Sequence, residues 1–555
     1  MGRYLIEAFD RGDRSDRYAT ERYQGAAGRN WWRCDPTLRL LMRRHLGEEG
    51  LAWAEPYLDR LGELTGGLVA ECAEETDRNP PRLEKYDKWG RDVSQVVMPP
   101  SFHTARRALM DNNFTSPSFA EQARAHGADP SALAAAWTYL LDQADIGMGC
   151  ALGTGGDMVV SLAEKHAPPD VLERVREIFA DGYYSGEAAQ MFTERTGGSD
   201  LAALETQAEP DGESWRVSGF KWFASNANGS AFVVLARLPD GAVAPFLVLW
   251  ERRDGSRNGV RIRRLKDKLG TRSVASAEVE FTEAEAFLLA GAGSGSGLGT
   301  MMKLTNASRL GVAMMGVGVA RRALVESICY ARAREAFGRP LIEQPLMRRK
   351  LAELIVEVEA AQAMVFDGLA GPRLRLAPAL IKLRAARLGV TAASDAIEVH
   401  GGNGYIEQWP VARLLRDAQV NPIWEGGDNI LCLDVRRAML KEQAHLPFLD
   451  RLRALATSDL VRARIDDLAK AIEAWSALER SVAEERLYPL AQFMADVYAA
   501  ALLEDQAAWG LDDGRKALVA RLYAEAHLVD HGPLRGIDRT AEVPFDELLE
   551  GAVSF

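Results

Sequence analysis

The sequence predicts an α+β protein built in four consecutive parts: an N-terminal helical domain, a central β-barrel-like domain, a C-terminal four-helix-bundle domain and a helical extension. Two observations lead to this order. Apolar residues recur at three- and four-residue spacing before residue 186 and again after about residue 300. Between them lie five short β-branched or aromatic segments separated by turn residues. The expected boundaries are 1–186, 187–290, 291–442 and 443–555.

The N-terminal part is predicted to consist of helices interrupted by one loop. "DPTLRLLMRRHL" and "AEPYLDRLGELTGGLVAECAEE" have helical apolar spacing, which resumes in "PSALAAAWTYLLDQADIGMGC". The prolines of "RNPPRLEKYDKWGRDVSQVVMPPSFH" predict a loop between these helical blocks.

After the β segments, the glycine-serine stretch "GAGSGSGLG" (291–299) contains no GxGxxG register. We therefore expect a linker there rather than a phosphate-binding loop. Long amphipathic segments such as "PLMRRKLAELIVEVEAAQAMVFDGLAG" and "APALIKLRAARLGVTAASDAIEVHGG" then predict the bundle. The extension is predicted to be helical throughout.

Composition and charge limit the classes of partner. The chain of 555 residues is 47% hydrophobic and carries a net charge of −12, which disfavours a general nucleic-acid binder. Residues 441–555 hold 13 basic and 21 acidic side chains, a net charge of −8. Four arginines of this segment still offer a local basic face: Arg451, Arg453, Arg462 and Arg464.

The five cysteines are scattered and show no CxxC spacing, which is typical of a reducing compartment. The N-terminal segment has charges where a signal peptide would have an apolar region. No uninterrupted run of 18 apolar residues occurs, so no membrane span is expected. The predicted location is the cytoplasm.

The stretch "NPIWEGGDNILCL" (421–433) places a glutamate in an unusual setting. Glu425 stands between Trp424 and the pair Gly426 and Gly427, and glycines let a backbone approach a bulky partner closely. Two interpretations are open. Glu425 either complements the dipole of the following helix or is a functional carboxylate beside a ligand.

Four further stretches are informative as a set: "MFTERTGGSD" (191–200), "KWFASN" (221–226), "ARAREAFGRPL" (331–341) and "EVHGGNGYIEQWP" (398–410). Taken alone, the first three predict a polar turn, a core aromatic residue in a strand and a helix stop, while the paired glycines of the fourth permit close approach to a ligand. His400 is expected to pack or cap, and His527 and His531 lack further metal ligands nearby, so no metal site is predicted.

In this order, and with a β domain between helical regions, the set resembles the acyl-CoA dehydrogenase family of flavoproteins. The resemblance is strong over 187–442 and weaker over 80–186. The long N-terminal region, "RLKDKLGTRSVASAEVEF", "IWEGGDNILCLDV" and the extension are most similar to the alkylation-response (AidB-type) branch, and this similarity covers nearly the whole chain.

The resemblance implies an FAD cofactor, an acyl-CoA substrate bound with the help of Arg309, and a homotetramer in which Arg334 and Phe337 reach a neighbour's FAD. It also implies that Glu425 is the catalytic base. The residues that it assigns to the cofactor are Met191, Thr193, Gly198, Ser199, Phe223, Ser225, Arg334, Phe337, Gly401, Gly402, Trp424, Gly427 and Asn429.

The implied reaction is α,β-dehydrogenation of the thioester to the 2,3-enoyl-CoA, with electrons passed on to an acceptor such as an electron-transfer flavoprotein. A carboxylate must be positioned and partly desolvated to remove the weakly acidic α-proton. The cofactor accepts the hydride while the protein supplies alignment. The backbone N–H of Glu425 is expected to help polarise the thioester oxygen.

Two alternatives remain. The first is a DNA-associated stress flavoprotein with vestigial dehydrogenase activity, which the charge disfavours. The second is nitroalkane oxidation, whose enzymes carry aspartate at the base position. Three departures from the family pattern, Arg195, Asn306 and Pro345, bear mainly on the CoA grip and substrate preference.

Overall fold

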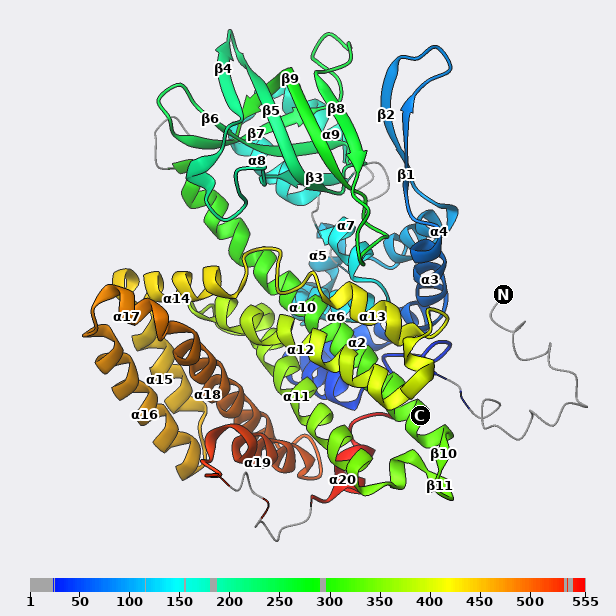
Figure 1. Cartoon of the computed structure of the whole chain (residues 1–555), viewed down its shortest axis with the longest axis vertical. Coiled ribbons are helices and arrows are strands. Elements are labelled where there is room, and N and C mark those ends of the chain that lie inside the picture. The colour runs from blue at the N-terminus through cyan, green and yellow to red at the C-terminus, as the bar shows by residue number, and fades with distance from the viewer. Residues whose placement is uncertain are drawn as a thin grey trace, which may run out of the picture. The chain divides into compact units, whose positions relative to one another are not determined.

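The computed structural model describes residues 23–554 apart from 24, 115, 154–155, 180–186, 290–295, 534–536 and 538–542. The chain forms two compact units (Figure 1). Unit 1 comprises the residues up to Glu71, Asn112–Ala144 and Ser308–Phe555, and unit 2 comprises Cys72–Asp111 and Asp145–Ala307. The α+β class is confirmed, with helical parts before and after a central β domain in the sequence. The expected four boundaries stay a prediction.

Unit 2 is built on a seven-stranded sheet whose pairing closes on itself. The order is β3-β6-β4-β5-β9-β7, β7 returns to pair with β6, and β8 joins β9. The barrel-like expectation therefore matches the observed pairing. The strands are β3 (Ala188–Met191), β4 (Gln207–Asp211), β5 (Ser214–Ser225), β6 (Ala231–Arg237), β7 (Val243–Leu249), β8 (Val260–Leu265) and β9 (Ser276–Leu288).

The alternation of the strands explains which face of the sheet is buried. In β8, Val260 and Ile262 are buried while Arg261 and Arg263 are exposed or nearly so, as a period of two requires. Phe232 and Phe246 of the paired strands β6 and β7 belong to the same fully buried apolar cluster. This cluster makes the β domain a rigid support for the motif residues on β3 and β5.

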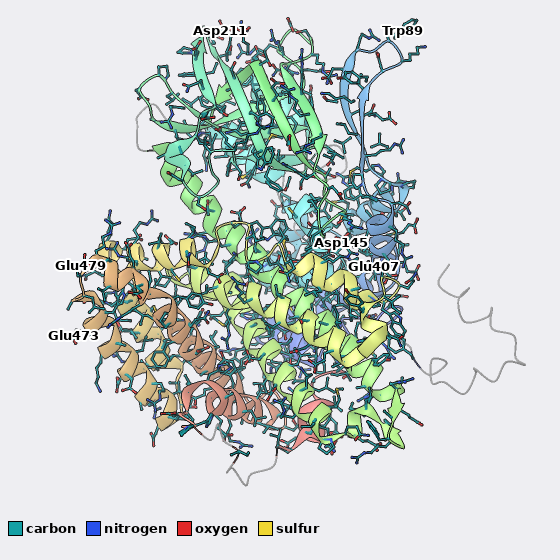
Figure 2. The ribbon with its side chains drawn as sticks, in the orientation of Figure 1. Trp89, Asp145, Asp211, Glu407, Glu473 and Glu479 are labelled. Atoms are coloured by element: carbon teal, nitrogen blue, oxygen red, sulfur yellow. The ribbon has the colours of Figure 1, made fainter. Side chains whose placement is uncertain are left out.

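A hairpin occupies the stretch in which the sequence predicted a loop. Strands β1 (Arg82–Tyr86) and β2 (Asp92–Val97) pair antiparallel, and the turn between them places Gly90 at φ +76°. The prediction was wrong because flanking prolines concealed the alternation of short strands, and prolines outside a strand do not prevent pairing. Figure 2 shows Trp89 at the hairpin tip, with 72% of its surface exposed.

The helices of unit 2 lie before the sheet in sequence. They are α3 (Ala70–Arg78), which begins just before this unit, α4 (Pro100–Met110), α7 (Ile146–Gly153), α8 (Gly156–His166) and α9 (Pro169–Ile178), with the short turn η4 (Leu201–Ala203) between strands. The stretch Ile146–His166 is long and apolar enough to cross a membrane by length and composition, but 60% of its apolar window is buried inside the protein. Core helices of soluble proteins pass the same test, so this finding is weak evidence for a membrane span.

Unit 1 is helical. Its elements from the first half of the chain are α2 (Pro36–Leu64), η3 (Thr65–Val69), α5 (Pro117–Ala125) and α6 (Pro130–Ala144). The bundle elements are α10 (Ser296–Ala333), β10 (Glu335–Ala336), β11 (Arg339–Pro340), η5 (Leu341–Glu343), α11 (Pro345–Ala370), α12 (Ala377–His400), η6 (Gly401–Tyr405), α13 (Pro410–Ala418) and α14 (Asp428–Glu442). Helix α10 begins at Ser296, inside the segment expected to be a linker; residues 291–295 lie outside the described part.

The helical extension is confirmed and packs on the bundle. It comprises α15 (His445–Leu455), α16 (Asp459–Ser476), α17 (Arg480–Glu485), α18 (Leu487–Ala508), α19 (Arg515–Leu528) and α20 (Phe545–Glu550). Helices α18 and α19 lie against α11 (Figure 1). There the fully buried Glu359 of α11 forms ion pairs with Arg515 and Lys516 of α19, both at 2.5 Å. Removing one member of such a buried set would leave an uncompensated charge, so the extension is an integral part of unit 1.

Helices α10 and α12 approach each other through small residues. A Cβ atom on Gly316 of α10 would lie 2.3 Å from the carbonyl oxygen of Ala385, and one on Gly389 of α12 would lie 2.9 Å from the carbonyl oxygen of Gly316. Arg309 and Lys382 stand seven residues, about two helical turns, before Gly316 and Gly389 respectively. The close crossing therefore fixes the two helices from which both cations extend.

We predict that Gly316→Ala lowers the free energy of unfolding by about 1–3 kcal/mol, because the added methyl group must push α12 away. Gly311→Ala on the same helix is the matched control. A Cβ there meets nothing within 4 Å, so alanine should stabilise by roughly 0.5–1 kcal/mol. Urea denaturation compares the two variants; similar effects would show that the crossing is not close.

Candidate active site

The glutamate singled out in the sequence lies in a strained turn between α13 and α14. Glu425 has φ +55°, a value that non-glycine residues rarely adopt, and Gly426 follows at φ +97°. A Cβ on Gly426 would also lie 3.1 Å from Cγ2 of Ile430. Strain of this kind persists only where neighbouring contacts hold it, and it is concentrated at functional sites.

The interpretation of Glu425 as a helix-start charge fits this geometry poorly. Helix α14 begins at Asp428 with Gly427 as its N-cap, and Asp428 is the acidic residue of the first turn. Glu425 therefore stands two residues before the cap. Asp428, which is paired with Arg387 at 2.7 Å, is the better candidate for complementing the helix dipole.

Three consecutive carbonyl groups of the turn have donors. Nε of Arg309 donates to the oxygen of Glu425 at 3.3 Å, and Nζ of Lys382 donates to the oxygen of Gly426 at 2.7 Å. The oxygen of Gly427 accepts from the first turn of α14. Side chains from α10 and α12 thus hold the two successive peptide groups on either side of the Gly426 Cα atom.

Arg309 is itself anchored by a carboxylate that sequence reasoning missed. Nη1 of Arg309 lies 2.6 Å from Oδ2 of Asp434 on α14, and Arg375 contacts the same carboxylate at 2.7 and 3.1 Å. These two arginines hold the pKa of Asp434 below its usual range against the effect of burial. The buried guanidinium of Arg309 is therefore committed to the turn and to Asp434, and its role in substrate binding stays a prediction.

Burial and nearby charges shift the pKa of Glu425 in opposite directions. Burial raises the pKa of the Glu425 carboxyl above its ordinary value of 4.5, while the charges of Arg309 and Lys382 act to lower it. The residue is only half-buried, so part of its surface still reaches solvent. A carboxylate in this environment is more basic than a surface glutamate.

The motif residues assigned to the flavin in unit 2 lie on neighbouring backbone segments. Thr193 forms a bridge with Phe223, and the oxygen of Thr193 accepts from the backbone N–H of Trp222 at 2.8 Å. A Cβ on Gly198 would lie 3.0 Å from Oγ1 of Thr193. Phe223 leaves 46% of its surface exposed, which is unusual for a large aromatic residue in a strand.

The remaining three residues of this group have different settings. Met191 is fully buried in β3 and Ser199 is exposed. Oγ of Ser225 lies 3.0 Å from Oγ of Ser276. Met191 therefore contributes to the core, while Ser199 offers its hydroxyl at the surface.

A buried ion pair ties the first two motifs together. Nζ of Lys221, in "KWFASN", lies 2.5 Å from Oε1 of Glu194, in "MFTERTGGSD", and donates to the oxygen of Leu235 at 2.7 Å. Glu194 also accepts from the backbone N–H of Glu205 and Thr206. Sequence reasoning missed this pair, although a lysine at an inward strand position was the available signal.

The other assigned residues lie in unit 1. Arg334 immediately precedes β10 and is exposed. Phe337 lies in the β10–β11 turn with φ +53° and is 97% exposed. Gly401, at φ +60°, caps α12, and side chains added at Gly401 or Gly402 would meet nothing within 4 Å. Asn429 is exposed at the start of α14.

Two of the departures from the family pattern have clear structural settings. The guanidinium of Arg195 lies 4.8 Å from the ring centre of Phe220 and 5.0 Å from that of Trp222. Pro345 begins α11, and Nε2 of the preceding Gln344 donates to the oxygen of Ala336 at 3.0 Å. Gln344 thus supports the turn that presents Phe337.

The local arginine face of the extension is neutralised within the described structure. Arg451 pairs with Asp367 at 2.6 Å, and Arg453, Arg462 and Arg464 each have an aspartate partner within 4.0 Å. His527 contacts Glu357 and Arg384, and His531 contacts the oxygen of Glu525. Both histidines therefore have protein partners.

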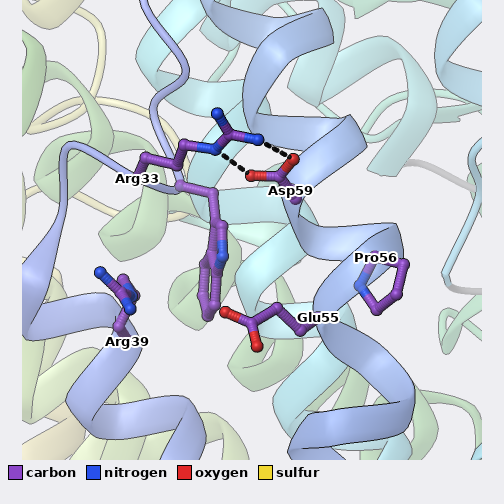
Figure 3. Close-up of a pocket in the computed structure, with 6 residues that line it drawn as sticks. Arg33, Arg39, Glu55, Pro56 and Asp59 are labelled. Carbon is purple, nitrogen blue, oxygen red and sulfur yellow. Dashed lines mark hydrogen bonds and ion pairs between the residues drawn. The ribbon is translucent and has the colours of Figure 1, made fainter.

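A cavity of about 480 Å³ lies apart from these motifs in sequence (Figure 3). Its lining comes from Trp32, Arg33, Arg39, Glu55, Pro56 and Asp59. Arg33 and Asp59 of this lining lie side by side and form an ion pair at 2.6 Å. No residue from the family motifs lines this cavity, so we do not assign the chemistry to it.

Comparison with known proteins places the chain among enzymes of one family. The adaptive response protein AidB N-terminal domain matches residues 23–182, the acyl-CoA dehydrogenase middle domain matches 189–284, and the acyl-CoA dehydrogenase C-terminal domain matches 295–440. The Glu425 turn lies in the third of these regions, and the Thr193 and Phe223 motifs lie in the second.

Individual relatives agree. The putative acyl-CoA dehydrogenase AidB of Escherichia coli is 34% identical over 418 residues, which cover 71% of this chain and 76% of the relative. Acyl-CoA dehydrogenase family member 11 of Caenorhabditis elegans is 27% identical over 537 residues, which cover 90% of this chain and 84% of the relative. The crystal structure of Caenorhabditis elegans ACDH-11 in complex with C11-CoA superposes with a TM-score of 0.83, at 26% identity, over 92% of this chain and 93% of that one. The chain belongs to the acyl-CoA dehydrogenase family.

Proposed function

We propose that the chain is an FAD-dependent acyl-CoA dehydrogenase in which Glu425 removes the α-proton of an acyl-CoA thioester. The product is the 2,3-enoyl-CoA. The observation that carries this proposal is the half-buried Glu425 carboxyl, held in a strained turn by cations from two helices within the region that matches the family's C-terminal domain. The acceptor of the electrons is proposed to be an external protein such as an electron-transfer flavoprotein.

The residues present fit a flavin nucleotide. Phe223 and Phe337 expose aromatic surface. Gly198, Gly401 and Gly402 have no side chain, so a ligand can approach their backbone closely. Nε1 of Trp424 is buried and has no hydrogen-bond partner among the described residues. FAD would supply the acceptor for the β-hydride, and the cofactor residues named from the sequence would hold it.

The role of this chain's own residues is to prepare one proton transfer. Arg309 and Lys382 fix the backbone of the turn, so the Glu425 carboxyl keeps one orientation. Desolvation makes this carboxylate a stronger base, and correct placement of a base and its substrate lowers the entropic part of the barrier. The α-proton leaves carbon 2 for a carboxylate oxygen of Glu425.

A second candidate is the AidB-type stress flavoprotein, with DNA as a partner. The match to the AidB N-terminal domain over residues 23–182 favours it. Two observations disfavour a strong DNA-binding surface. The net charge is −12, and aspartates neutralise the arginines of the extension, namely Arg451, Arg453, Arg462 and Arg464. We therefore rank it second. A cytoplasmic location is likewise proposed.

We predict that Glu425→Gln leaves FAD bound and the fold intact but slows acyl-CoA-driven flavin reduction by roughly 10² to 10⁴, because the general base is lost. Anaerobic mixing with a panel of acyl-CoAs, followed by flavin absorbance, measures this rate. Glu398→Gln is a matched control, since Glu398 is an exposed carboxylate that pairs with Lys350. Rapid flavin bleaching in Glu425→Gln would place the base elsewhere.

We predict that kcat/KM falls on acidification with an apparent pKa above 4.5, because burial raises the pKa of Glu425 and only its ionised form is a base. The sign for stability is opposite. A carboxyl with a raised folded pKa stabilises the fold most below its unfolded pKa and loses that contribution as pH rises through the folded pKa. In the wild type, the free energy of unfolding should therefore decrease as pH rises from 4.5 through the folded pKa of Glu425, and Glu425→Gln should remove this decrease. Unchanged pH dependence of unfolding would contradict the assignment.

We predict a homotetramer that requires Phe337 for full cofactor affinity, since a nearly fully exposed aromatic ring beside Arg334 is suited to contact a neighbouring subunit. Phe337→Ala should weaken FAD binding by about tenfold or more. Trp89→Ala, at another exposed aromatic residue, is the control. Light scattering that finds a stable FAD-bound monomer would refute the prediction.

We predict that any DNA binding is weak and is lost steeply as salt rises, because an acidic protein makes few phosphate contacts. Fluorescence anisotropy with a duplex at several salt concentrations measures this. Nanomolar binding that persists at physiological salt would favour the stress-protein alternative.

A further inference from the structure

Helix α12 carries a lysine, Lys382, that none of the sequence motifs singled out. Lys382 is fully buried, and its only hydrogen bond within the described residues is the one from Nζ to the oxygen of Gly426 at 2.7 Å. No carboxylate of the described structure lies within ion-pairing distance of it. A buried ammonium group with one carbonyl acceptor is costly, so a specific role has to offset that cost.

The setting of Lys382 points to Glu425. The carbonyl that it binds belongs to the residue directly after Glu425, in a turn where both residues have positive φ. Its positive charge acts on the Glu425 carboxyl in the same direction as that of Arg309. We propose that Lys382 is a positioning residue for Glu425, which holds the strained turn through the Gly426 carbonyl and stabilises the carboxylate form through its charge. This inference rests on the proposed role of Glu425 as base.

Other charges near this pair come from three helices. Arg309 reaches in from α10, Arg387 lies on α12 with Lys382, and α14 contributes Asp428. Of these, Arg309 has its own carboxylate partner, Asp434, and Arg387 is paired with Asp428.

Unlike Arg309 and Arg387, Lys382 has no carboxylate partner of its own among the described residues. Burial lowers the pKa of Lys382 to about 8, the opposing attractions being those of Asp428 and Glu425. Lys382 thus lacks a dedicated anion, and Glu425 is one of the two acidic groups that favour its charged form. Each charge of the Lys382–Glu425 pair therefore supports the other, and removal of either should shift the titration of its partner.

The test compares Lys382→Gln and Lys382→Met with Lys350→Met in the FAD-loaded enzyme. Gln keeps a hydrogen-bond donor without the charge, whereas Met removes both. Lys350 is the control because its ammonium group forms ion pairs with Asp395 and Glu398, each at 2.9 Å. The measurement is kcat/KM for an acyl-CoA as a function of pH.

We expect both Lys382 variants to move the acid limb upward by about one pH unit or more, since loss of a nearby cation makes Glu425 harder to ionise. Lys350→Met should leave the acid limb in place. A purely structural role would lower the thermal midpoint and kcat without moving the limb. An acid limb that stays in place in both Lys382 variants overturns the proposal.

A second readout needs no turnover. A double-mutant cycle measures unfolding of the wild type, Lys382→Gln, Glu425→Gln and the double variant in urea at several pH values. The proposal predicts a favourable coupling at pH 7 that vanishes at low pH, where Glu425 is protonated. If the wild type reduces no flavin with any acyl-CoA while this coupling persists, the proposed function fails and the Lys382–Glu425 interaction stands; zero coupling at every pH contradicts the interaction.

Discussion

One constraint governs the candidate active site: a carboxyl group that burial would neutralise is held in a turn by two cations. Glu425 adopts a left-handed backbone conformation that is unfavourable for a residue with a side chain. Arg309 and Lys382 compensate by donating to the carbonyl oxygens of Glu425 and Gly426. The geometry and the electrostatics of the base therefore share the same two residues.

This constraint explains features that lie some distance away in the fold. The glycines of α10 and α12 bring the two helix backbones close together, and the two cations extend from those helices. Asp434 engages the guanidinium of Arg309, so that Lys382 is the cation without a committed anion. The extension packs against α11 through the buried Glu359, Arg515 and Lys516, and α11 in turn packs against α12. Unit 1 is thus organised around the helices that support the turn.

The sequence allowed the general organisation to be predicted because periodicity is a local property. Short β-branched or aromatic segments between turn residues indicated the strands β5 to β9 of the β domain, and three- and four-residue spacing indicated the helices of the bundle and extension. The hairpin at 82–97 was missed because its strands are short and contain a single buried residue, Ser94, which leaves only a weak alternation between the prolines. Family matches confirm the resemblance that the motifs indicated, including the AidB-type N-terminal region.

The supporting residues of the site were harder to predict, for a physical reason. Glu425 was identifiable because its glycine and tryptophan neighbours are unusual for a surface carboxylate. Lys382 and Asp434 sit in ordinary helical sequence, and their partners are 44 and 125 residues away in the chain. Only tertiary packing brings them together, although a lysine on the apolar face of "APALIKLRAARLG" was a signal that a buried charge needed a partner.

The role of Glu425 as base is tested most directly by the rate of anaerobic flavin reduction by an acyl-CoA that carries deuterium at carbon 2, measured beside the protiated thioester across pH. If Glu425 removes that proton as an ionised base, deuterium slows the reduction several-fold, and both substrates share an acid limb above pH 4.5. Equal rates for the two substrates, or an acid limb at the ordinary value of a glutamate, would contradict the account.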